Sequence, residues 1–395
     1  MTDKAAAPAL AASKSAQNAG KGLQNIVIGQ TRLSLVNGTE GKLIYAGYKI
    51  EDLAEFATFE EVIYLLWNGK LPNRSQLEEM RKSLLKEMSL SPEILAVMQK
   101  LSKQATPMAV VRTVVSALAL WDPAADNNSP EENQRKAMLL TSKTPAIVAA
   151  WERIRSGKEP LSPRADLNLA GNFLYMLKGT EPQKQEVAVI DAYLVLLSEH
   201  GMNASTFSAR VTTSTLSDMY SAITTAIGTL KGAAHGGANE EAMRMFFEIG
   251  SADNVEKWFN ENVKTSKKRV MGMGHRVYKA LDPRAAVLRN KARVMAEATN
   301  NLKWFDLAAK LEQTARADEE FIKKNLYANV DYYSAIALYT VGIPMDQFTP
   351  LFVIARVPGW CAHVIEQWAD NRLIRPDVDY VGPLDLQWVP IEQRS

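Results

Sequence analysis

Apolar residues recur at helical spacing along most of the chain. Between residues 75 and 88, Leu77, Met80 and Leu84 fall on one face of a helix, because steps of three and four residues return to the same side. Residues 186–197 are almost continuously apolar, which is typical of a helix that is buried on all sides. The pattern therefore predicts a largely helical protein with at least one helix in its core.

Helix start and stop signals extend this prediction. Ser-Pro pairs at Ser91, Ser129 and Ser162 predict helix starts, because serine accepts a hydrogen bond from a free backbone amide and proline suits the first helical position. The helix that begins at Ser162 is expected to end at Gly179. Apolar periodicity predicts further helices over residues 59–67, 110–120, 221–230, 284–298, 304–315, 332–341 and 349–368, and a polar, exposed helix over residues 255–264.

One stretch carries the signature of β-structure. Residues 31–47 hold β-forming side chains on both sides of Asn37-Gly38, a pair that favours a tight hairpin turn. The sequence contains no repeat of the length found in solenoid proteins. The expected fold class is therefore all-α, with many helices and a small N-terminal β-hairpin.

Size and composition narrow the class of protein. A chain of 395 residues exceeds the size at which one hydrophobic core keeps growing, so two domains are expected. The apolar fraction of 47% and the charged fraction of 23% are those of a soluble globular protein, and a net charge of +2 favours neither nucleic acid nor a membrane as partner. The single cysteine, Cys361, excludes a disulfide framework and fits a reducing compartment, either the cytoplasm or a mitochondrial matrix.

Neither a membrane span nor a targeting signal is expected. The chain has no run of about 18 consecutive apolar residues. The first 20 residues are rich in Ala, Ser and Lys and lack a Leu/Val-rich centre, which argues against a secretory signal. Asp3 and the absence of arginine from this stretch argue against a transit peptide. We expect these residues to form a disordered lead-in.

The segment 270–284 is the richest candidate for chemistry. Two glycines precede His275 and allow the backbone to approach a ligand closely. Asp282 and the proline after it predict a helix start that places Arg284 in the first turn, near free amides and the positive end of the helix dipole. These groups suit an anionic ligand that carries a carbonyl, and the alternative is a basic turn between two helices.

Acid–base chemistry near neutral pH has few places in this chain, because only four histidines occur: His200, His235, His275 and His363. His200 follows the buried apolar segment and is either functional or a satisfied residue at a helix C-terminus. His235 lies among small residues in 232–240, where it either donates a hydrogen bond to a developing oxyanion or belongs to a tight turn. The first three are separated by 35 and 40 residues with no close histidine pair, so no metal site is expected.

Three other positions carry charges in unusual contexts. Asp331 precedes a predicted helix and is either its cap or a carboxylate general base, ionised at pH 7. Arg356 lies in an apolar helix, where burial demands an anionic partner, either a ligand or a protein carboxylate. Arg372 and Arg375, near the C-terminus, either bind an anion or form a solvated face.

Taken together, these segments resemble the citrate synthase family. In chain order they read SEHGMNASTF, GAAHGGANE, VMGMGHRVYKALDPR, NVDYYSA, ARVPGW and NRLIRP, and the early LSLVNGTEGKLIYAGYKIEDLA is similar to the family's N-terminal hairpin and first helix. The resemblance implies a helical two-domain fold with a tail over residues 1–22. A large domain would be formed by residues 23–234 and 332–395, and a small domain, residues 235–331, would close over the active site.

The resemblance also implies a reaction. Acetyl-CoA, oxaloacetate and water would give citrate and CoA, with Asp331 taking a proton from the acetyl methyl group. His235 would stabilise the enolate oxygen, and His275 would polarise and protonate the ketone. The residues implied for binding oxaloacetate are His200, His275, Arg284, Arg356 and Arg375, the last supplied across a homodimer.

The resemblance implies CoA contacts as well. The backbone that would take the adenine is formed by Val270, Met271, Gly272, Met273 and Gly274. Lys279 would bind a phosphate, whereas Lys267, Lys268 and Arg269 either bind phosphates or form a solvated face. Neither a metal nor a separate cofactor is implied, since acetyl-CoA is a substrate. The expected location is the cytoplasm, and no nucleic-acid or membrane partner is expected.

Two alternatives stay open at this point. One is 2-methylcitrate synthase, which would use propionyl-CoA with the same catalytic groups, because one methylene in an acyl pocket discriminates by only about 1–3 kcal/mol. The other is a non-catalytic helical scaffold that binds CoA. A scaffold predicts that the catalytic groups are lost, yet His235, His275 and Asp331 are all present.

Overall fold

The computed structural model describes residues 21–23 and 26–394. The chain divides into two units. Thr31–Arg372 forms a compact unit that contains the helices and the sheet, and Leu373–Ser395 belongs with the residues up to Gln30 to the second unit.

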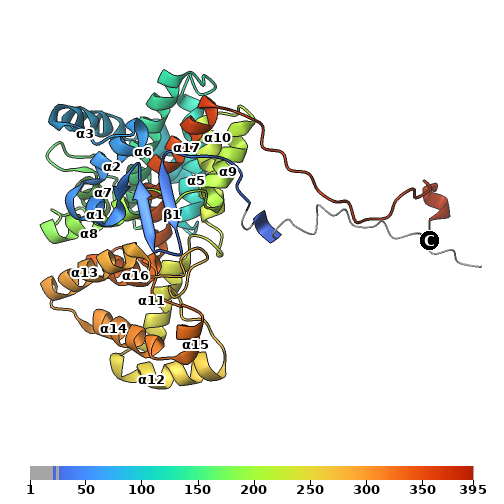
Figure 1. The fold of residues 1–395 in the computed structure, drawn as a ribbon. Helices are drawn as coiled ribbons and strands as arrows, with labels where there is room; N and C mark the ends of the chain where they lie inside the picture. Colours follow the sequence, from blue (N-terminus) through green and yellow to red (C-terminus); the bar gives the residue numbers. More distant parts are fainter. Residues whose placement is uncertain (1–20, 24–25, 395) are drawn as a thin grey trace, which may run out of the picture. The chain divides into compact units, whose positions relative to one another are not determined.

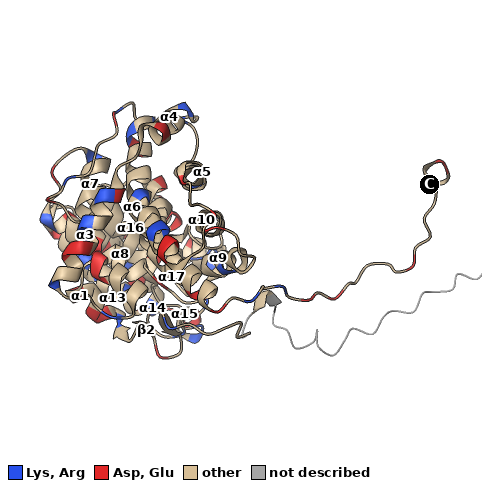
Figure 2. Ribbon diagram, turned by 90° about the horizontal axis from the view of Figure 1, so that it is seen from above, with Lys and Arg blue, Asp and Glu red and all other residues tan. Residues whose placement is uncertain are grey.

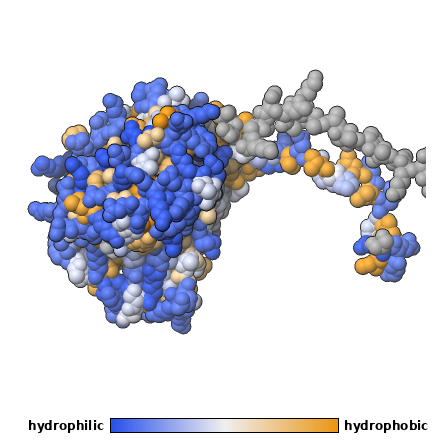
Figure 3. All heavy atoms as spheres, turned by 90° about the horizontal axis from the view of Figure 1, so that it is seen from below, coloured by the Kyte–Doolittle hydropathy of each residue, from blue (hydrophilic) through white to orange (hydrophobic). Residues whose placement is uncertain are grey.

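The second unit is irregular in its described part. Two short 3₁₀ turns, η1 (Lys21–Leu23) and η6 (Ile391–Gln393), interrupt it. Apolar side chains along its C-terminal segment are exposed (Figure 3). Val381 and Trp388 are among them. The disordered lead-in predicted for residues 1–22 lies outside the described residues except for its last two.

The predicted all-α fold class is confirmed. The fold is mostly helical (63%) and its described part contains seventeen α-helices. The first nine are α1 (Ile50–Phe56), α2 (Phe59–Asn68), α3 (Arg74–Met88), α4 (Pro92–Lys100), α5 (Pro107–Ala117), α6 (Pro130–Arg155), α7 (Leu169–Lys178), α8 (Lys184–Leu197) and α9 (Ala204–Ser214). The others are α10 (Met219–Leu230), α11 (Ala238–Ile249), α12 (Val255–Trp258), α13 (Pro283–Ala298), α14 (Lys303–Arg316), α15 (Glu319–Lys323), α16 (Val330–Val341) and α17 (Phe348–Ala369).

Helix α17 lies at the centre of the compact unit. With the preceding turn η5 (Met345–Gln347) it is the one helix in the described part that is long and apolar enough to cross a membrane, and 94% of its most apolar window is buried inside the protein. It packs against α6, α8, α9 and α10. Charged residues lie mainly on outer helices such as α3, while α17 and α8 are largely uncharged (Figure 2). This burial identifies α17 as a core helix.

Two groups of helices position the residues singled out from the sequence. Helices α11, α12, α14 and α15 lie together at one end of the compact unit (Figure 1). Helices α13 and α16 pack against each other, and both also contact the buried helix α8. The first residues of α13 and α16 therefore come close to the last residues of α8.

The predicted hairpin is confirmed and gains a third strand. Strands β1 (Ser34–Asn37), β2 (Lys42–Tyr45) and β3 (Tyr48–Lys49) form an antiparallel sheet in that order, with Ser34 opposite Tyr45. The backbone amide of Lys279 donates to the carbonyl of Gly38 in the hairpin turn (2.8 Å). The hairpin thus supports the segment that carries His275.

One predicted helix start is wrong. The helix expected to begin at Ser162 begins instead at Leu169, where the Asn168 side chain accepts a hydrogen bond from the backbone amide of Gly171. The side-chain amide of Asn172 donates to the carbonyls of Arg164 and Leu167 (both 2.9 Å) and so holds the preceding residues in a turn. The cap at Asn168 and the two hydrogen bonds from Asn172 together fix the start of α7 at Leu169.

The segment predicted as a polar, exposed helix differs in character. It is α12 followed by a π-helical turn, η4 (Phe259–Thr265), and it buries Val255, Trp258 and Phe259. Helices α9 and α11 are absent from the prediction. Small and polar residues dominate the sequence of α9, whereas α11 has an apolar face that the prediction overlooked. Asn203, whose side chain accepts from the amides of Ser205 and Thr206, is the start signal that marks α9.

Candidate active site

The loop before α13 is tied to the start of α16. Gly272 has a positive φ of 77°, and a Cβ atom there would lie 2.8 Å from a backbone Cα atom of α16, so only glycine fits. The Asn329 backbone amide donates to the carbonyl of Gly272 (2.9 Å), and its side-chain amide donates to the carbonyl of Gly274 (2.7 Å). His275 directly follows Gly274, and Asp331 lies two residues after Asn329. These bonds therefore fix the distance between the backbones of His275 and Asp331.

His275 presents one ring nitrogen to the site. Its Nδ1 accepts hydrogen bonds from the backbone amides of Val277 (3.0 Å) and Tyr278 (3.2 Å). Burial, aided by the charge of Arg284, lowers its pKa to about 4. A neutral ring whose Nδ1 accepts must carry its proton on Nε2, so His275 is a neutral donor at pH 7.

His200 lies directly beside His275. The two ring centroids are 5.5 Å apart, edge to face, and Nε2 of His200 is 3.2 Å from the Tyr278 hydroxyl. Burial lowers the pKa of His200 well below its ordinary value, and the charge of Arg284 acts in the same direction. The ends of α8 and of the 270–282 loop therefore bring two neutral imidazoles together.

His235 is held in the turn between α10 and α11. The Ser205 backbone amide donates to its Nε2 (3.3 Å), which favours a proton on Nδ1, and the Ser205 hydroxyl lies 2.9 Å from the same nitrogen. Trp360 in turn donates to that hydroxyl (3.3 Å). Burial, with a contribution from Arg356, lowers the pKa of His235 to about 4. It is a second neutral N–H donor.

Arg284 lies in a buried pair with Asp282. Its Nε and Nη2 donate to the two carboxylate oxygens at 3.0 and 2.9 Å, and both side chains are almost completely buried. Asp282 caps α13 as predicted, because it also accepts from the Arg284 backbone amide (3.0 Å), and it accepts from the Val330 amide at the start of α16 (3.2 Å). One carboxylate thus joins two helix starts and orients the guanidinium.

Arg356 is buried without an ion pair. The side chain is 1% exposed, and its Nε donates to the Leu197 carbonyl at the end of α8 (2.5 Å). No carboxylate in the described part of the chain lies within 4.0 Å of its nitrogens. Burial lowers the pKa of Arg356 and the charge of Glu199 acts against this effect. Of the two partners left open by the sequence, the internal salt bridge is absent among the described residues.

Asp331 is not the cap of its helix. Asn329 caps α16, and its side chain accepts from the Asp331 amide (2.9 Å), so the Asp331 carboxylate has no capping role. Burial raises its pKa to about 6, against the lowering charges of Arg284 and Arg356. A carboxylate with this pKa is mostly ionised at pH 7 and is matched to proton abstraction near neutral pH.

Comparison with known proteins agrees with this geometry. The family model described as "Citrate synthase, C-terminal domain" matches residues 22–377. The chain is 45% identical over 376 residues to "Citrate synthase 2" of Bacillus subtilis, covering 95% of this chain and 99% of the relative.

The chain belongs to the citrate synthase family.

Further members of the family support the assignment. "Citrate/2-methylcitrate synthase" of Bacillus subtilis is 38% identical over 368 residues, covering 93% of this chain and 97% of the relative. The crystal structure of citrate synthase from Pyrobaculum aerophilum superposes with a TM-score of 0.89 at 41% identity, covering 95% of each chain. Citrate synthase of Thermoplasma acidophilum, solved as a ternary complex with carboxymethyl coenzyme A and oxaloacetate, has a TM-score of 0.89 at 35% identity and covers 95% of this chain and 99% of its own.

Arg375 is not placed with the other predicted site residues. It lies in the second unit, where its side chain is 75% exposed and pairs with Asp377 (2.8 Å). The citrate synthase resemblance assigns this arginine to the site of a partner subunit, and that assignment stays a prediction.

The predicted CoA residues lie on the same loop and differ in exposure. Val270 and Gly272 are buried, Met271, Met273 and Gly274 are half-buried, and Lys279 is exposed. Lys268 pairs with Glu248 (2.6 Å), which supports the solvated-face alternative for the charge run 267–269. Lys279 forms no side-chain hydrogen bond or ion pair among the described residues, so its ammonium is available to a phosphate.

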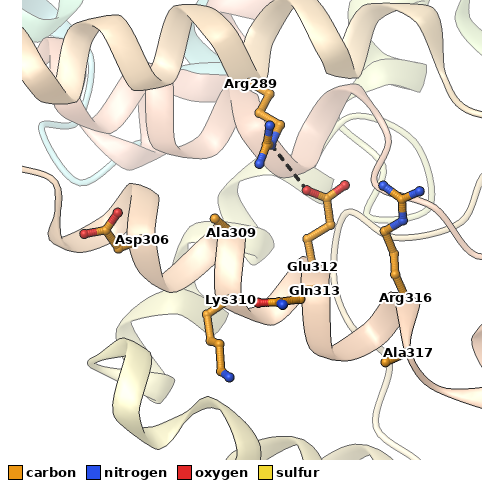
Figure 4. Close-up of a pocket in the computed structure, with 8 residues that line it drawn as sticks. All are labelled: Arg289, Asp306, Ala309, Lys310, Glu312, Gln313, Arg316 and Ala317. Carbon is orange, nitrogen blue, oxygen red and sulfur yellow. Dashed lines mark ion pairs between the residues drawn. The ribbon is translucent and has the colours of Figure 1, made fainter.

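One hollow in the described part lies away from these histidines and arginines. It measures about 700 Å³ between α13 and α14 and is lined by Arg289, Asp306, Ala309, Lys310, Glu312, Gln313, Arg316 and Ala317. Figure 4 shows Arg289 directed at Glu312, an ion pair of 3.5 Å. None of the predicted catalytic or oxaloacetate residues lines it, so we place the active site by its histidines and arginines instead.

Several residues around the citrate synthase site were not singled out from the sequence. Ser205 orients His235, Tyr278 contacts His200, and Tyr193 has a buried hydroxyl with no hydrogen-bond partner in the described part of the chain. Glu199 is a fully buried carboxylate next to His200. A carboxylate between an apolar helix and a histidine is the sequence signal that could have marked Glu199, since acidic residues are rarely fully buried without a partner.

Proposed function

We propose that this protein condenses acetyl-CoA with oxaloacetate and hydrolyses the resulting citryl-CoA to citrate and CoA. The observation that carries the proposal is the convergence of neutral imidazole donors, buried guanidinium groups and a carboxylate whose pKa is about 6. The named relatives and the oxaloacetate complex of Thermoplasma acidophilum citrate synthase support it.

Oxaloacetate is a dianion, so its two carboxylates need cations. Arg356 can donate from both Nη atoms to a substrate carboxylate, because only its Nε is hydrogen-bonded, to the Leu197 carbonyl. Arg284 is held rigid by Asp282 and offers its remaining Nη1. His200 adds a neutral N–H donor beside His275. Forked guanidinium groups fix the orientation of a carboxylate and therefore of the ketone between the two carboxylates.

The first chemical step is removal of a proton from the methyl group of acetyl-CoA. The Asp331 carboxylate takes the proton, and the C–H electron pair moves to form the enolate. The Nδ1–H of His235 donates to the enolate oxygen as charge develops there. A preorganised donor of this kind contributes about 3–4 kcal/mol to the transition state. A carboxylate alone is far too weak a base for this proton.

The second step forms the carbon–carbon bond. The enolate carbon attacks the ketone carbon of oxaloacetate, and the C=O electron pair moves to oxygen, which takes the Nε2 proton of His275. The product is citryl-CoA. Water then attacks the thioester carbonyl of citryl-CoA and gives a proton to the deprotonated Nε2 of His275, which restores the neutral imidazole. The C–S bond breaks, the thiolate of CoA takes the proton that Asp331 removed in the first step, and citrate is released.

We further propose that CoA binds along Val270–Gly274, with Lys279 at a phosphate. The backbone of this loop is fixed to α16 through Asn329, so it is preorganised. Helices α11, α12, α14 and α15, grouped at one end of the unit (Figure 1), fit a small domain of residues 235–331 that moves as a body. Closure of that domain would exclude water from the reaction.

The working unit that we propose is a homodimer in the cytoplasm. Apolar side chains near the ends of α5 and α9 are exposed, with Leu120 at 79% and Leu216 at 65%, which suits a surface covered by a second copy. Arg375 would complete the partner's site. A cytoplasmic location fits Cys361, which is free and buried.

The direct test measures free thiol released from acetyl-CoA with and without oxaloacetate. Release that requires oxaloacetate supports the proposal, and its absence from well-folded protein favours the scaffold alternative. Asp331→Gly should leave the Kd for oxaloacetate near that of the wild type while turnover falls by about 10²–10⁴-fold, the usual contribution of a general base. Equal loss of binding and turnover would mean that Asp331 is structural.

A second candidate, 2-methylcitrate synthase, is favoured by one of the relatives, "Citrate/2-methylcitrate synthase" of Bacillus subtilis. It uses the same groups with propionyl-CoA. The ratio of kcat/KM for acetyl-CoA and propionyl-CoA separates the two. We expect acetyl-CoA to be preferred, and a clear preference for propionyl-CoA would make the second candidate the function.

A further inference from the structure

Glu199 is a buried carboxylate that has no role in the reaction as described above. It follows α8 directly before His200 and is 0% exposed. Its Oε1 accepts from the Ser34 hydroxyl (2.9 Å), the Gly201 backbone amide (2.6 Å) and His363 Nε2 (2.9 Å). Three donors on one oxygen hold the carboxylate in one orientation.

The other oxygen of Glu199 lies beside the helix that carries Arg356. Its Oε2 is buried and has no hydrogen-bond partner in the described residues, and a Cβ atom at Gly359 would lie 2.8 Å from it. Gly359 is one turn beyond Arg356 on α17. Glu199 is the carboxylate whose charge acts most strongly on Arg356, yet the two form no ion pair within 4.0 Å.

His363 is the residue that engages Glu199 from α17. Its side chain is 0% exposed, and because a carboxylate only accepts, the bonded Nε2 carries a proton. Its Nδ1 lies 3.8 Å from the Glu366 carboxylate, which also accepts from Arg210 Nη1 (3.1 Å). The imidazole therefore lies between two carboxylates but is hydrogen-bonded only to Glu199, since its Nδ1 has no hydrogen-bond partner in the described residues.

We propose that Glu199 and His363 are positioning residues for the binding of oxaloacetate. The hydrogen bonds from His363, Ser34 and Gly201 hold the Glu199 carboxylate away from Arg356, so that the Arg356 guanidinium stays free for a substrate carboxylate. Glu199 still supplies the nearby negative charge that a buried cation needs. This inference rests on the proposed function.

Loss of the donor from His363 has a specific consequence. A buried carboxylate that loses a hydrogen bond turns to the nearest alternative partner, because an unpaired buried charge is costly. For Glu199 that partner is the guanidinium of Arg356. The new ion pair would compete with oxaloacetate for Arg356, and the competition would vanish if residue 199 carried no charge.

The test compares His363→Ala in the wild type and in a Glu199→Gln background. Glutamine keeps an acceptor oxygen in place but removes the charge. We expect His363→Ala to raise the oxaloacetate KM about tenfold in the wild type and less than about twofold in the Glu199→Gln background, the non-additivity expected of residues in one network. The KM for acetyl-CoA should stay within about twofold in both. Titration calorimetry with oxaloacetate alone checks that the KM follows the Kd.

Gln367→Ala is the matched control for burial. Gln367 is 5% exposed on the same helix, one turn beyond His363, and accepts from Arg210 Nε (2.8 Å) without touching Glu199. This variant should lose stability with an unchanged oxaloacetate KM. If His363→Ala does not fold, Ser34→Ala removes a less buried donor to Glu199 and should raise the oxaloacetate KM about threefold, again only when Glu199 is charged.

The outcomes separate this inference from the proposed function. Equal effects of His363→Ala in both backgrounds, or a fall in kcat with an unchanged oxaloacetate KM, would show that His363 only stabilises the fold and would overturn the inference. A wild-type protein that releases no thiol in the presence of oxaloacetate would refute the proposed function itself. If the wild type is active and His363→Ala has the same effect in both backgrounds, only the positioning role is refuted and the proposed function stands.

Discussion

The chemistry of single residues in this protein is set by burial more than by neighbouring charges. Asp331 and His275 are shifted in opposite directions, to a pKa of about 6 and about 4, because burial disfavours the charged form of each. The result is an ionised base and a neutral acid at the same pH. Pairs of groups whose surroundings move their pKa values this way are typical of acid–base sites.

The acid side of the pH profile should report Asp331. The carboxylate is a base only when ionised, so kcat/KM for acetyl-CoA should fall about tenfold per pH unit below about pH 6 and level off above it. His235, with a pKa of about 4, stays neutral across this range. Initial rates between pH 5 and 8 measure this fall in kcat/KM. Circular dichroism at each pH confirms that the fold is intact. A midpoint near 4 would mean that Asp331 is solvated in the free enzyme.

Residue identities in the site were largely readable from the sequence, whereas their protonation states were not. The glycines, the Asp-Pro helix start and a rare histidine identify residues 270–284 as a candidate site from the sequence alone. The tautomer of His275 depends on two backbone amides that reach Nδ1, and the burial of Glu199 depends on Ser34, which is far away in the chain. Local patterns do not carry information about such distant contacts.

At the scale of elements, the site is built from helix ends. The last residues of α8 bring His200, the first turn of α13 brings Arg284, and the first turn of α16 brings Asp331. Free amides at helix starts favour anions there, which explains why a site for a dicarboxylate gathers two helix N-termini. Asp282 is the connection between these two helices, since it accepts from the backbone amides of both.

Asp282→Asn should therefore destabilise the fold strongly. The substitution keeps the shape of the side chain but leaves the buried Arg284 without a countercharge, a change that typically costs about 3–5 kcal/mol. Urea unfolding measures the loss in the free energy of unfolding. Glu297→Gln is the control, because Glu297 pairs with Arg293 on the exposed face of the same helix (3.9 Å) and should cost less than about 0.5 kcal/mol. Similar losses for the two variants would contradict the assigned role of Asp282.

Gly359→Ala tests how closely α17 must approach the end of α8. A Cβ atom there would lie 2.1 Å from the Ser198 carbonyl oxygen, so the helices would have to move apart, at a cost of about 1–3 kcal/mol. The shift would also displace Arg356, and the oxaloacetate KM should rise. Thermal unfolding and steady-state kinetics measure both effects. Gly228→Ala in α10, where the nearest atom to a new Cβ is 3.8 Å away, should be neutral or stabilising.

Helix positions were predicted well where apolar periodicity was strong and poorly where it was weak. Helices α3, α8, α13, α14 and α17 were placed to within two residues. Helix α7 was misplaced because Asn172, a residue inside the helix, holds the turn before it. Helix α9 was missed because its packing face is formed by small and polar residues such as Ser205 and Thr206. Helix α11 is the exception to this rule, because Met243, Phe246 and Ile249 recur at helical spacing and the prediction overlooked them.

At the scale of the whole molecule, the question is what completes the site. The compact unit contains every predicted catalytic residue and four of the five predicted oxaloacetate residues, while Arg375 belongs to the second unit. Sequence resemblance assigns this arginine to a partner subunit, so the prediction concerns the assembled protein and is tested on mixed assemblies. Symmetric dimers are the commonest assemblies of soluble proteins, and a shared site is one consequence of such symmetry.

Subunit complementation gives a decisive prediction for Arg375. Asp331→Gly and Arg375→Ala should each be nearly inactive alone. If Arg375 acts across the interface, a mixed dimer has one site with both defects and one site with neither, so co-expression with random pairing should restore about one quarter of the wild-type activity. If Arg375 acts within its own chain, every site in the mixed dimer keeps one defect and no activity returns. Differently tagged chains, purified through both tags, would raise the expected recovery to about one half, because only mixed dimers remain. Recovery that fails in a mixed dimer of verified mass would place Arg375 in the site of its own chain, where it would bind the dianion together with Arg284 and Arg356.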